Sequence, residues 1–382
     1  MCNGRVNNKA NSSISALLHA SIEDGNFPSA VYIVAEKGQC VFADALGDAV
    51  REPAQHPASF ETIYDLASLT KPFVTGLLCA RLIERGELTL DEPVANHLTE
   101  FDRPDKDKIT VRQLLTHTSG LPAWRPLYLL TDGRPEATLR AIAEEPLELP
   151  AGARVIYSDL GFIALGFLLQ KMSGRILADI AGSEIIERLA LKSTFFNPIQ
   201  AMQTGIAACE SGNAYERDMC ERDFAGRTYA GWRSDIIWGE VHDGNAHFLG
   251  GAAGHAGLFS NAGETLLLAN QFIAGLSDLL SATTCDLFRQ NMTPELNEAR
   301  SFAWQLAATP ESTAGSALPP DAFGHNGFTG TSCWIDAENK RAFILLTNRT
   351  HAHKLPFTNI NSVRREFHRI AVEALDTNSA VK

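Results

Sequence analysis

The sequence has no long apolar run, no cluster of basic residues and no closely spaced pair of cysteines. No stretch approaches the roughly 18 uninterrupted apolar residues that a membrane helix needs. The N-terminus lacks the apolar segment of a secretory signal. Acidic residues outnumber basic ones by 45 to 33, and the net charge is −12. These absences predict a cytoplasmic protein that binds neither nucleic acid nor membrane.

The seven cysteines are odd in number and contain no Cys-x-x-Cys. Free thiols in a reducing compartment are the simplest interpretation. Cys209 and Cys220 could instead pair or bind a metal. Two other groups could also hold a metal, although neither has the spacing of a common zinc site: His242, Asp243, His247 and His255, and His351 with His353. We therefore predict no metal and no cofactor.

Two common active-site motifs are also missing. No Gly-x-Ser-x-Gly occurs, which argues against an α/β-hydrolase. The glycine- and histidine-rich segment 241–260 has no Gly-Lys-Ser/Thr, so it is not a phosphate loop. A His/Ser pair in His117–Pro122 is better interpreted as a turn after a short helix.

Both ends of the chain are predicted to supply strands and amphipathic helices. These are a helix over 12–24, strands within 31–47, 301–307, 331–336 and 341–347, and a helix over 358–375. The pattern predicts an α+β fold with an antiparallel sheet built from both chain ends and flanked by the terminal helices. We predict a single catalytic unit over 1–382, with an α/β subdomain (12–65 and 299–376) and an inserted, mainly helical subdomain (66–298). A cleft is expected where they meet.

A Ser-x-x-Lys element opens a predicted helix that runs to about Gly86. Ser68 and Lys71 are three residues apart, so they share one helix face. A serine hydroxyl is a poor nucleophile until a nearby base takes its proton, and a lysine can act as that base. The spacing alone is weak support, because Ser379–Lys382 matches it as well.

Two further elements follow along the chain. Tyr157-Ser158-Asp159 precedes a strongly apolar predicted helix over 160–172, a good position to hold a phenol over a cleft. Ser158 or Asp159 could also simply cap that helix. The segment Gly324–Gly330, which contains His325, Asn326, Gly327 and Phe328, comes just before the predicted strand 331–336. Its small residues allow backbone to approach a ligand closely.

Ser-x-x-Lys, Tyr-x-Asp and His-x-Gly in this order resemble the class C β-lactamase-related serine hydrolases. The fragments LTLDEPVANHL, ITVRQLLTHTSGLP, HAGLFSNAGE and LLTNR are similar to that family too. The resemblance implies a penicillin-binding-protein-like fold and an acyl-enzyme on Ser68. Lys71 and Tyr157 would share the proton transfers, and the sequence does not assign the base to either. The N–H groups of Ser68 and Phe328 would form an oxyanion hole, and His325 would line the sheet side of the cleft.

Two departures from the β-lactamase pattern narrow the expected substrate. His325 stands where the family usually has a lysine, and a histidine is largely neutral at pH 7. Asp159 stands where an asparagine is usual, and an ionised carboxylate cannot donate to a substrate carbonyl. Both changes favour a small ester, amide or peptide-like substrate that is uncharged or carries a positive group, with weak β-lactam turnover. The alternatives are a true β-lactamase, a D-amino-acid peptidase, or a non-hydrolytic acyl-binding sensor. The sequence predicts no oligomeric state.

Overall fold

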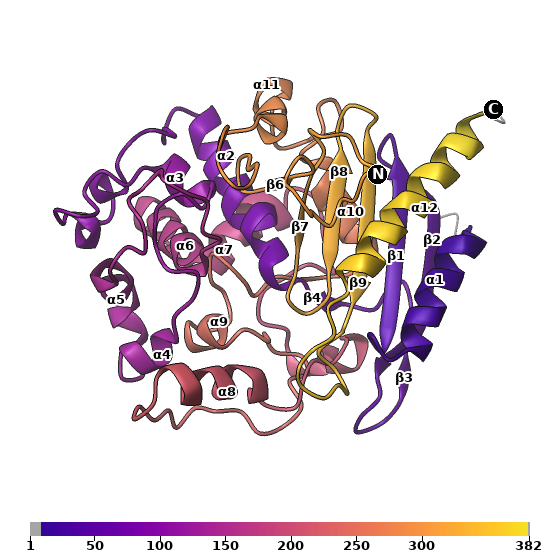
Figure 1. The fold of residues 1–382 in the computed structure, drawn as a ribbon, viewed down its shortest axis with the longest axis horizontal. Coiled ribbons are helices and arrows are strands. Elements are labelled where there is room, and N and C mark those ends of the chain that lie inside the picture. The colour runs from indigo at the N-terminus through magenta and orange to yellow at the C-terminus, as the bar shows by residue number, and fades with distance from the viewer. Residues whose placement is uncertain (1–8, 381–382) are drawn as a thin grey trace.

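The computed structural model describes residues 9–380, and it contains a seven-stranded antiparallel sheet in the order β3-β2-β1-β9-β8-β7-β6 (Figure 1). The N-terminal strands β3-β2-β1 join the C-terminal strands β9-β8-β7-β6 at one place, where β1 pairs with β9 from Ala30↔Thr347 to Glu36↔Arg341. The strands are β1 (Ser29–Glu36), β2 (Gln39–Val50), β3 (His56–Pro57), β6 (Gln305–Leu306), β7 (Phe323–Asn326), β8 (Ser332–Asp336) and β9 (Arg341–Thr347). This sheet and its helices confirm the predicted α+β class.

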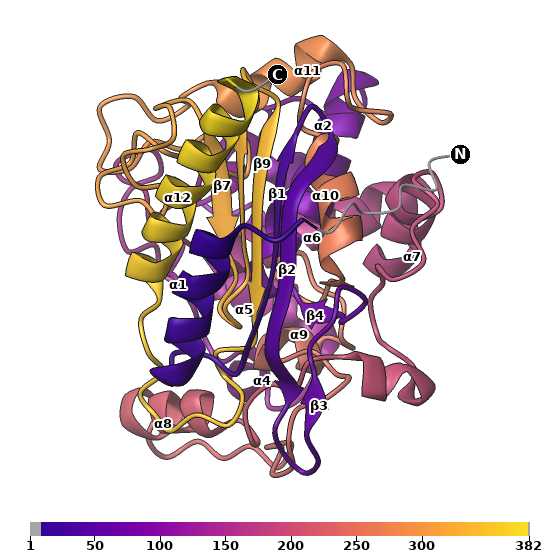
Figure 2. The ribbon, with the colours of Figure 1, turned by 90° about the vertical axis from the view of Figure 1, so that its right-hand side faces the viewer.

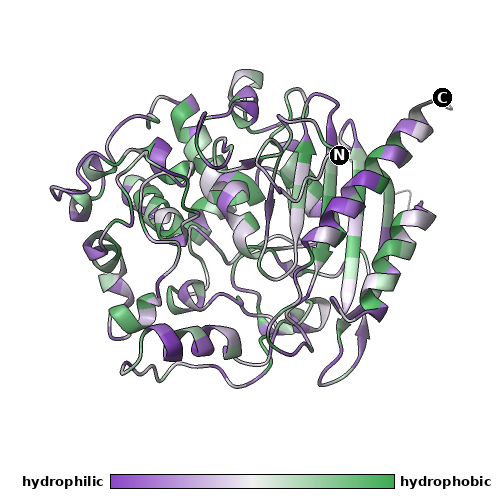
Figure 3. Cartoon of the chain, viewed as in Figure 1, coloured by the Kyte–Doolittle hydropathy of each residue, from purple (hydrophilic) through white to green (hydrophobic). Residues whose placement is uncertain are grey.

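Helices cover both faces of the sheet, and for this reason β1 is buried along nearly its whole length. The terminal helices α1 (Ser12–Glu23) and α12 (Asn361–Ala380) lie side by side on one face (Figure 2). Along α12, hydrophilic and hydrophobic residues alternate, as expected for a helix with one packed side (Figure 3). On the other face, α10 (Ala262–Asn270) packs on β1 and β9. The predicted terminal helices are confirmed.

The segment between β4 (Tyr64–Asp65) and β6 is mainly helical, apart from β5 (Phe259–Ser260), which pairs with β4. Its central helix is α6 (Asp159–Ser173), which is buried along most of its length and confirms the helix predicted there. The other helices are α2 (Leu77–Glu84), α3 (Val111–Leu115), α4 (Leu127–Leu130), α5 (Thr138–Glu144), α7 (Leu177–Ala181), α8 (Ala214–Asp223), α9 (Gly244–Phe248) and α11 (Ala282–Asp286).

The helix predicted from Ser68 to Gly86 is present but is not uniform. It begins with a 3₁₀ turn (Ala67–Leu69), continues as a wider π-type segment (Lys71–Gly76) and ends as α2 at Glu84. Wide turns of this kind occur often at functional sites. The second Ser-x-x-Lys match, Ser379–Lys382, lies partly outside the described residues.

Two strand predictions at the C-terminal end need correction. Most of the predicted strand 301–307 is irregular, and only Gln305–Leu306 pair, with β7. Residues Phe323–Asn326, which were predicted to precede a strand, form strand β7 themselves. The reason is long-range packing: the Trp334 ring on β8 lies directly over Gly324, where a Cβ would come within 2.1 Å of it. A glycine is a weak strand former by itself, so local sequence gave no signal.

Within residues 9–380, no single helix is long and apolar enough to cross a membrane. Asp159–Ser173 and Leu177–Ile186 are long and apolar enough only when taken together, and the two segments are bent by 74° relative to each other.

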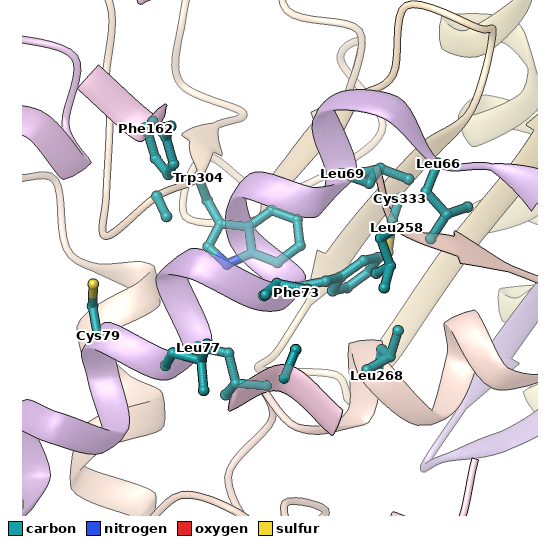
Figure 4. Close-up of a cluster of buried hydrophobic side chains, with 14 of the residues drawn as sticks. Leu66, Leu69, Phe73, Leu77, Cys79, Phe162, Leu258, Leu268, Trp304 and Cys333 are labelled. Atoms are coloured by element: carbon teal, nitrogen blue, oxygen red, sulfur yellow. The ribbon is translucent and has the colours of Figure 1, made fainter. Parts of the chain in front are cut away.

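The main core joins the helical segment to the sheet, and Phe73 lies near its centre (Figure 4). Its ring is fully buried, 5.6 Å from the Trp304 ring and 6.0 Å from the Phe272 ring between centroids. Aromatic packing of this kind fixes the helix that begins at Ser68 against both layers.

We predict that Phe73→Ala lowers the free energy of unfolding by about 3–5 kcal/mol, because it removes a buried ring and leaves a cavity. Leu267→Ala, at a side chain that is 43% exposed, serves as the control and costs less than about 1 kcal/mol. Urea unfolding followed by circular dichroism measures both. Equal losses for the two variants would contradict this assignment of the core.

Candidate active site

A cleft of about 520 Å³ opens where the helical segment meets the β7 side of the sheet. Ser68, Tyr157, Asp159 and the four residues His325–Phe328 line it, and Lys71 lies buried beside Ser68. The structure therefore brings together all eight residues that the sequence singled out. The other lining residues are Ala67, Trp124, Tyr215, Glu216, Met219, His242, Asp243, Ala256, Arg300, Gln305, Arg349, Asn361 and Arg364.

Ser68 is presented by a strained turn. Ala67, just before it, has a φ of +47°, a left-handed conformation that costs energy for a residue with a Cβ. The buried Asp65 carboxylate holds this turn, because it accepts the Ala67 N–H (2.8 Å) and the His242 N–H (2.7 Å). Thr70 Oγ1 also donates to the Ala67 carbonyl (2.7 Å). The turn and the segment at His242 are thus tied to one carboxylate.

Lys71 is completely buried, and its ammonium contacts three groups. Nζ donates to Ser68 Oγ (2.9 Å) and to the His255 carbonyl (3.2 Å), and it lies 2.8 Å from Asp159 Oδ1. Burial by itself lowers the pKa of Lys71, but the charge of Asp159 and the contact with Tyr157 outweigh burial and raise it above its usual value. Lys71 is therefore an ammonium at neutral pH in the unliganded protein.

Tyr157 lies beside Lys71, whose Nζ is 4.9 Å from the centroid of the Tyr157 ring. Burial raises the pKa of the Tyr157 phenol, Lys71 lowers it and Asp159 raises it, with a net upward shift. The rings of His117 and His325 flank the phenol, with centroids 4.5 and 5.7 Å from its own. The neighbouring Ser158 caps α6 by accepting the Gly161 N–H (3.2 Å), as the alternative interpretation of this motif predicted.

His325 lies at the end of β7 and is neutral. Burial holds its pKa well below the usual range. Its Nδ1 lies 2.9 Å from the Asn326 carbonyl oxygen, which can only accept, so Nδ1 carries the proton and Nε2 presents a lone pair. Within the described residues that Nε2 is buried and has no hydrogen-bond partner.

Gly327 allows the β7–β8 turn to approach the turn at Ser68. A Cβ at this position would lie 2.1 Å from Thr331 Oγ1 and 2.6 Å from the Leu66 carbonyl. A larger residue would push Phe328 away from Ser68. Within residues 9–380 neither the Ser68 N–H nor the Phe328 N–H donates to another group, and both residues line the cleft.

Asp159, Asp243 and His255 bring ligand atoms within 4.8 Å of one another, close enough to hold a metal ion. The Lys71 ammonium is already bound there, to Asp159 and to the His255 carbonyl, and it supplies the positive charge. His255 Nε2 contacts Asp243 Oδ1 at 2.8 Å. The other two histidines that the sequence grouped with Asp243 and His255 contact different acids: His242 pairs with Glu210, and His247 faces Glu240. Cys209 and Cys220 are separate free thiols.

Several residues of the cleft wall could not be predicted from the sequence. Glu216 on α8 and Asp243 before α9 form an acidic part, and burial together with Asp243 raises the pKa of Glu216 to about 7. Arg349 and Arg364 form a basic part at the sheet side. Arg349 belongs to the fragment LLTNR, which is similar to the family but does not by itself indicate a role for the arginine. Glu216 and Arg364 stand in segments without any recognisable motif.

Comparison with known proteins agrees with this geometry. A sequence model of the β-lactamase family matches residues 14–364. A putative D-alanyl-D-alanine carboxypeptidase of Escherichia coli (strain K12) is 30% identical over 358 residues, which cover 86% of this chain and 80% of that protein. The N-acetylmuramyl-L-alanine amidase of Bacillus subtilis (strain 168) is 31% identical over 350 residues, which cover 85% of this chain and 78% of that protein.

Solved structures share the fold. A penicillin-binding protein homologue from Caulobacter crescentus superimposes with a TM-score of 0.72 at 19% identity, covering 96% of this chain and 98% of that one. A class C β-lactamase from Rhodobacter sphaeroides superimposes with a TM-score of 0.69 at 20% identity, covering 95% of this chain and 100% of that one. The hydrolase EstCE1, described as having promiscuous acyltransferase activity, superimposes with a TM-score of 0.71 at 22% identity, covering 93% of this chain and 97% of that one. The predicted penicillin-binding-protein-like fold is confirmed.

We predict that Asp159→Asn lowers the free energy of unfolding at pH 7 by about 3 kcal/mol, because it leaves the buried Lys71 ammonium without a counter-charge. The pKa of Lys71 is raised on folding, so this stabilisation is present at neutral pH and is lost as pH rises above about 10.5. Urea titrations at pH 7 measure it.

The control is Asp91→Asn, which breaks the exposed ion pair with Arg112 (2.7 Å). An exposed pair contributes less than about 1 kcal/mol. If both substitutions cost the same, the charge of Lys71 does not depend on Asp159.

Proposed function

The chain belongs to the β-lactamase family of serine hydrolases, and on that premise we propose that it cleaves an ester or amide bond through an acyl-enzyme on Ser68. The observation that carries the proposal is the buried contact of 2.9 Å between Lys71 Nζ and Ser68 Oγ. A lysine on the surface of a helix would be solvated, whereas this one is fully enclosed beside a hydroxyl that lines the cleft. Activation of serine by a neighbouring base is the general requirement for such a nucleophile.

The reactive form of the Lys71/Tyr157 pair carries one proton fewer than the resting form, in which Lys71 is an ammonium and Tyr157 a neutral phenol, so the pair first loses one proton to solvent. Ser68 Oγ then bonds to the substrate carbonyl carbon, and its proton passes to the deprotonated member of the pair. The same pair returns that proton to the leaving oxygen or nitrogen as the old bond breaks. Water then repeats the sequence on the acyl-enzyme and releases the acid. Because the pKa values of Lys71 and Tyr157 are both raised and depend on each other, the pair acts as one coupled proton carrier.

The developing oxyanion is bound by the N–H groups of Ser68 and Phe328. Among the described residues neither amide has a hydrogen-bond acceptor, and both residues line the cleft, as a preorganised oxyanion hole requires. The strained turn at Ala67 fixes the first amide, and the close approach at Gly327 brings the second one to it.

The substrate is a small ester, amide or peptide-like molecule. The relatives named above as carboxypeptidase, amidase and hydrolase support this range. β-Lactam turnover is weak, because Asp159 cannot donate to the side-chain carbonyl of a β-lactam and its charge is committed to Lys71. The neutral His325 also offers no positive charge at the position where β-lactamases of this class usually have lysine.

We predict that Ser68→Ala lowers kcat/KM for short-chain 4-nitrophenyl esters by at least about a thousandfold, since the nucleophile is lost. Intact-mass spectrometry of the wild-type protein, quenched during turnover, is expected to show the mass of the acyl group on the peptide that contains Ser68. Ser379→Ala is the matched control and is expected to keep full activity. Equal rates in wild type and Ser68→Ala would remove the central claim.

For wild-type protein we predict a kcat/KM for a chromogenic cephalosporin at least about tenfold below that for 4-nitrophenyl butyrate. The physical reason is the missing amide donor at position 159. Parallel spectrophotometric assays at pH 7 test this. A cephalosporin hydrolysed faster than the ester would contradict the proposed preference, and would identify a true β-lactamase instead.

A further inference from the structure

His117 opens the segment His117–Pro122, which the proposed reaction does not use. The sequence predicts a turn there, and the structure confirms a turn at His117. The residue has a φ of +59°, a left-handed conformation that histidine and asparagine adopt more readily than most residues. Its side chain is 1% exposed and does not line the cleft. It therefore lies behind Tyr157, whose ring it contacts.

Residues 156–159, which include Tyr157, are bonded to this turn through the backbone. The Ile156 N–H donates to the His117 carbonyl (2.8 Å). The Asp159 N–H donates to the carbonyl of Ala123, just after the turn (2.8 Å). Neither bond involves the imidazole, so both can persist when the side chain at position 117 is changed.

The imidazole of His117 adds a bond between these two. The buried Ser158 N–H donates to its Nδ1 (3.0 Å). A backbone N–H can only donate, so Nδ1 has no proton and the neutral ring carries its proton on Nε2. Within the described residues Nε2 has no hydrogen-bond partner, so the contact with Ser158 is the one that the ring makes there. The acceptor thus serves the amide directly after Tyr157.

The same ring also packs against two aromatic side chains. Its centroid lies 4.5 Å from that of Tyr157 and 5.0 Å from that of Phe162 on α6. Packing of this kind restricts the tilt of a phenol. A phenylalanine at position 117 would provide a ring as well, but it could not accept the Ser158 N–H. The acceptor is therefore the property that distinguishes histidine from a purely hydrophobic residue here.

His117 accepts this bond only while its ring is neutral, because an imidazolium carries an N–H on both nitrogens. Burial holds the pKa of His117 well below its usual range, and the positive charges of Arg300 and Lys71 lower it further, with a smaller contribution from His325. The ring is thus neutral at the pH at which serine hydrolysis would be assayed, and Nδ1 is available to Ser158.

We propose that His117 is a positioning residue, which holds Tyr157 in place for proton transfer by accepting the Ser158 N–H. This inference rests on the proposed function, because it concerns how the Lys71/Tyr157 pair is held beside the nucleophile. A displacement of about 1 Å in a reacting group can lower a rate about a hundredfold. An acceptor that is buried and bonded to the next residue limits such a displacement.

Two substitutions separate the acceptor from the ring. His117→Phe keeps an aromatic ring and removes the acceptor. His117→Asn removes the ring, keeps an oxygen acceptor at the same bond position as Nδ1 and tolerates the left-handed φ. We expect kcat for 4-nitrophenyl butyrate to fall at least about tenfold in His117→Phe and to stay within about threefold of wild type in His117→Asn. KM changes little in either, since His117 does not line the cleft. An equal loss in both variants, or a larger loss in His117→Asn, overturns the inference.

A double-variant cycle tests whether His117 acts through Tyr157. In a Tyr157→Phe background we expect His117→Phe to lower kcat by less than about twofold, because the group that it positions is already missing. A general loss of structure would instead lower kcat by the same factor in both backgrounds. That result overturns the inference.

His351→Phe is the matched control. His351 is also buried, and its Nε2 accepts the Arg51 N–H (2.8 Å), but it does not line the cleft. This variant loses the same kind of bond and is expected to keep the wild-type kcat per folded molecule. Circular dichroism and the fraction of protein that forms the acyl-enzyme, measured by intact mass, correct every rate for misfolded protein.

The pH dependence of kcat distinguishes positioning from proton transfer by His117 itself. We expect wild type and His117→Asn to share the same acid limb, since a neutral His117 exchanges no proton with the substrate. A shifted limb would make His117 a proton carrier and overturn the inference. Each of these contrary results can occur while Ser68→Ala abolishes hydrolysis, in which case the serine hydrolase stands and only the role of His117 fails. Activity that persists in Ser68→Ala contradicts the proposed function instead.

Discussion

The ammonium of Lys71 is fully buried, and Asp159 balances its charge at 2.8 Å. Removing a charge from water is expensive unless a partner of opposite sign remains in contact. This ion pair joins the helix that begins at Ser68 to the first turn of α6, so the nucleophile and Tyr157 cannot separate without breaking it. The geometry around Ser68 thus depends on one electrostatic contact between two segments that lie far apart in the sequence.

A second constraint fixes the other wall of the cleft. The N- and C-terminal parts of the chain form one sheet because β1 pairs with β9. That pairing places the β7–β8 turn against Ala67, where only a glycine at position 327 fits. The same element carries His325 and Phe328. The two walls meet at Ser68, and the residues that act on a substrate come from both.

The sequence predicted the residues whose neighbours along the chain set their geometry. Ser68 and Lys71 lie one helical turn apart, and Tyr157 precedes a strongly apolar helix, so local patterns located them. The terminal helices and most strands followed from apolar periodicity for the same reason. Strand β7 did not, because Gly324 forms a strand only under the Trp334 ring. The positions of Arg349 and Arg364 in the cleft could not be predicted either, because only the fold brings the residues after β9 and the first turn of α12 to the cleft that Ser68 lines. Only the folded chain shows which charges remain unbalanced.

The charges in the cleft are of two kinds, and the difference determines what a ligand can gain. The acidic groups are already occupied: Asp243 accepts from the Ala246 N–H and contacts His255, and Glu216 accepts from the Gly244 N–H. A cationic ligand would have to compete with these contacts. Within residues 9–380 the guanidiniums of Arg349 and Arg364 donate only to neutral oxygens, so these two basic groups of the cleft are not balanced by an acid as Lys71 is. A bound ligand gains most where a buried charge is uncompensated, so the two sides of the cleft offer a substrate different interactions.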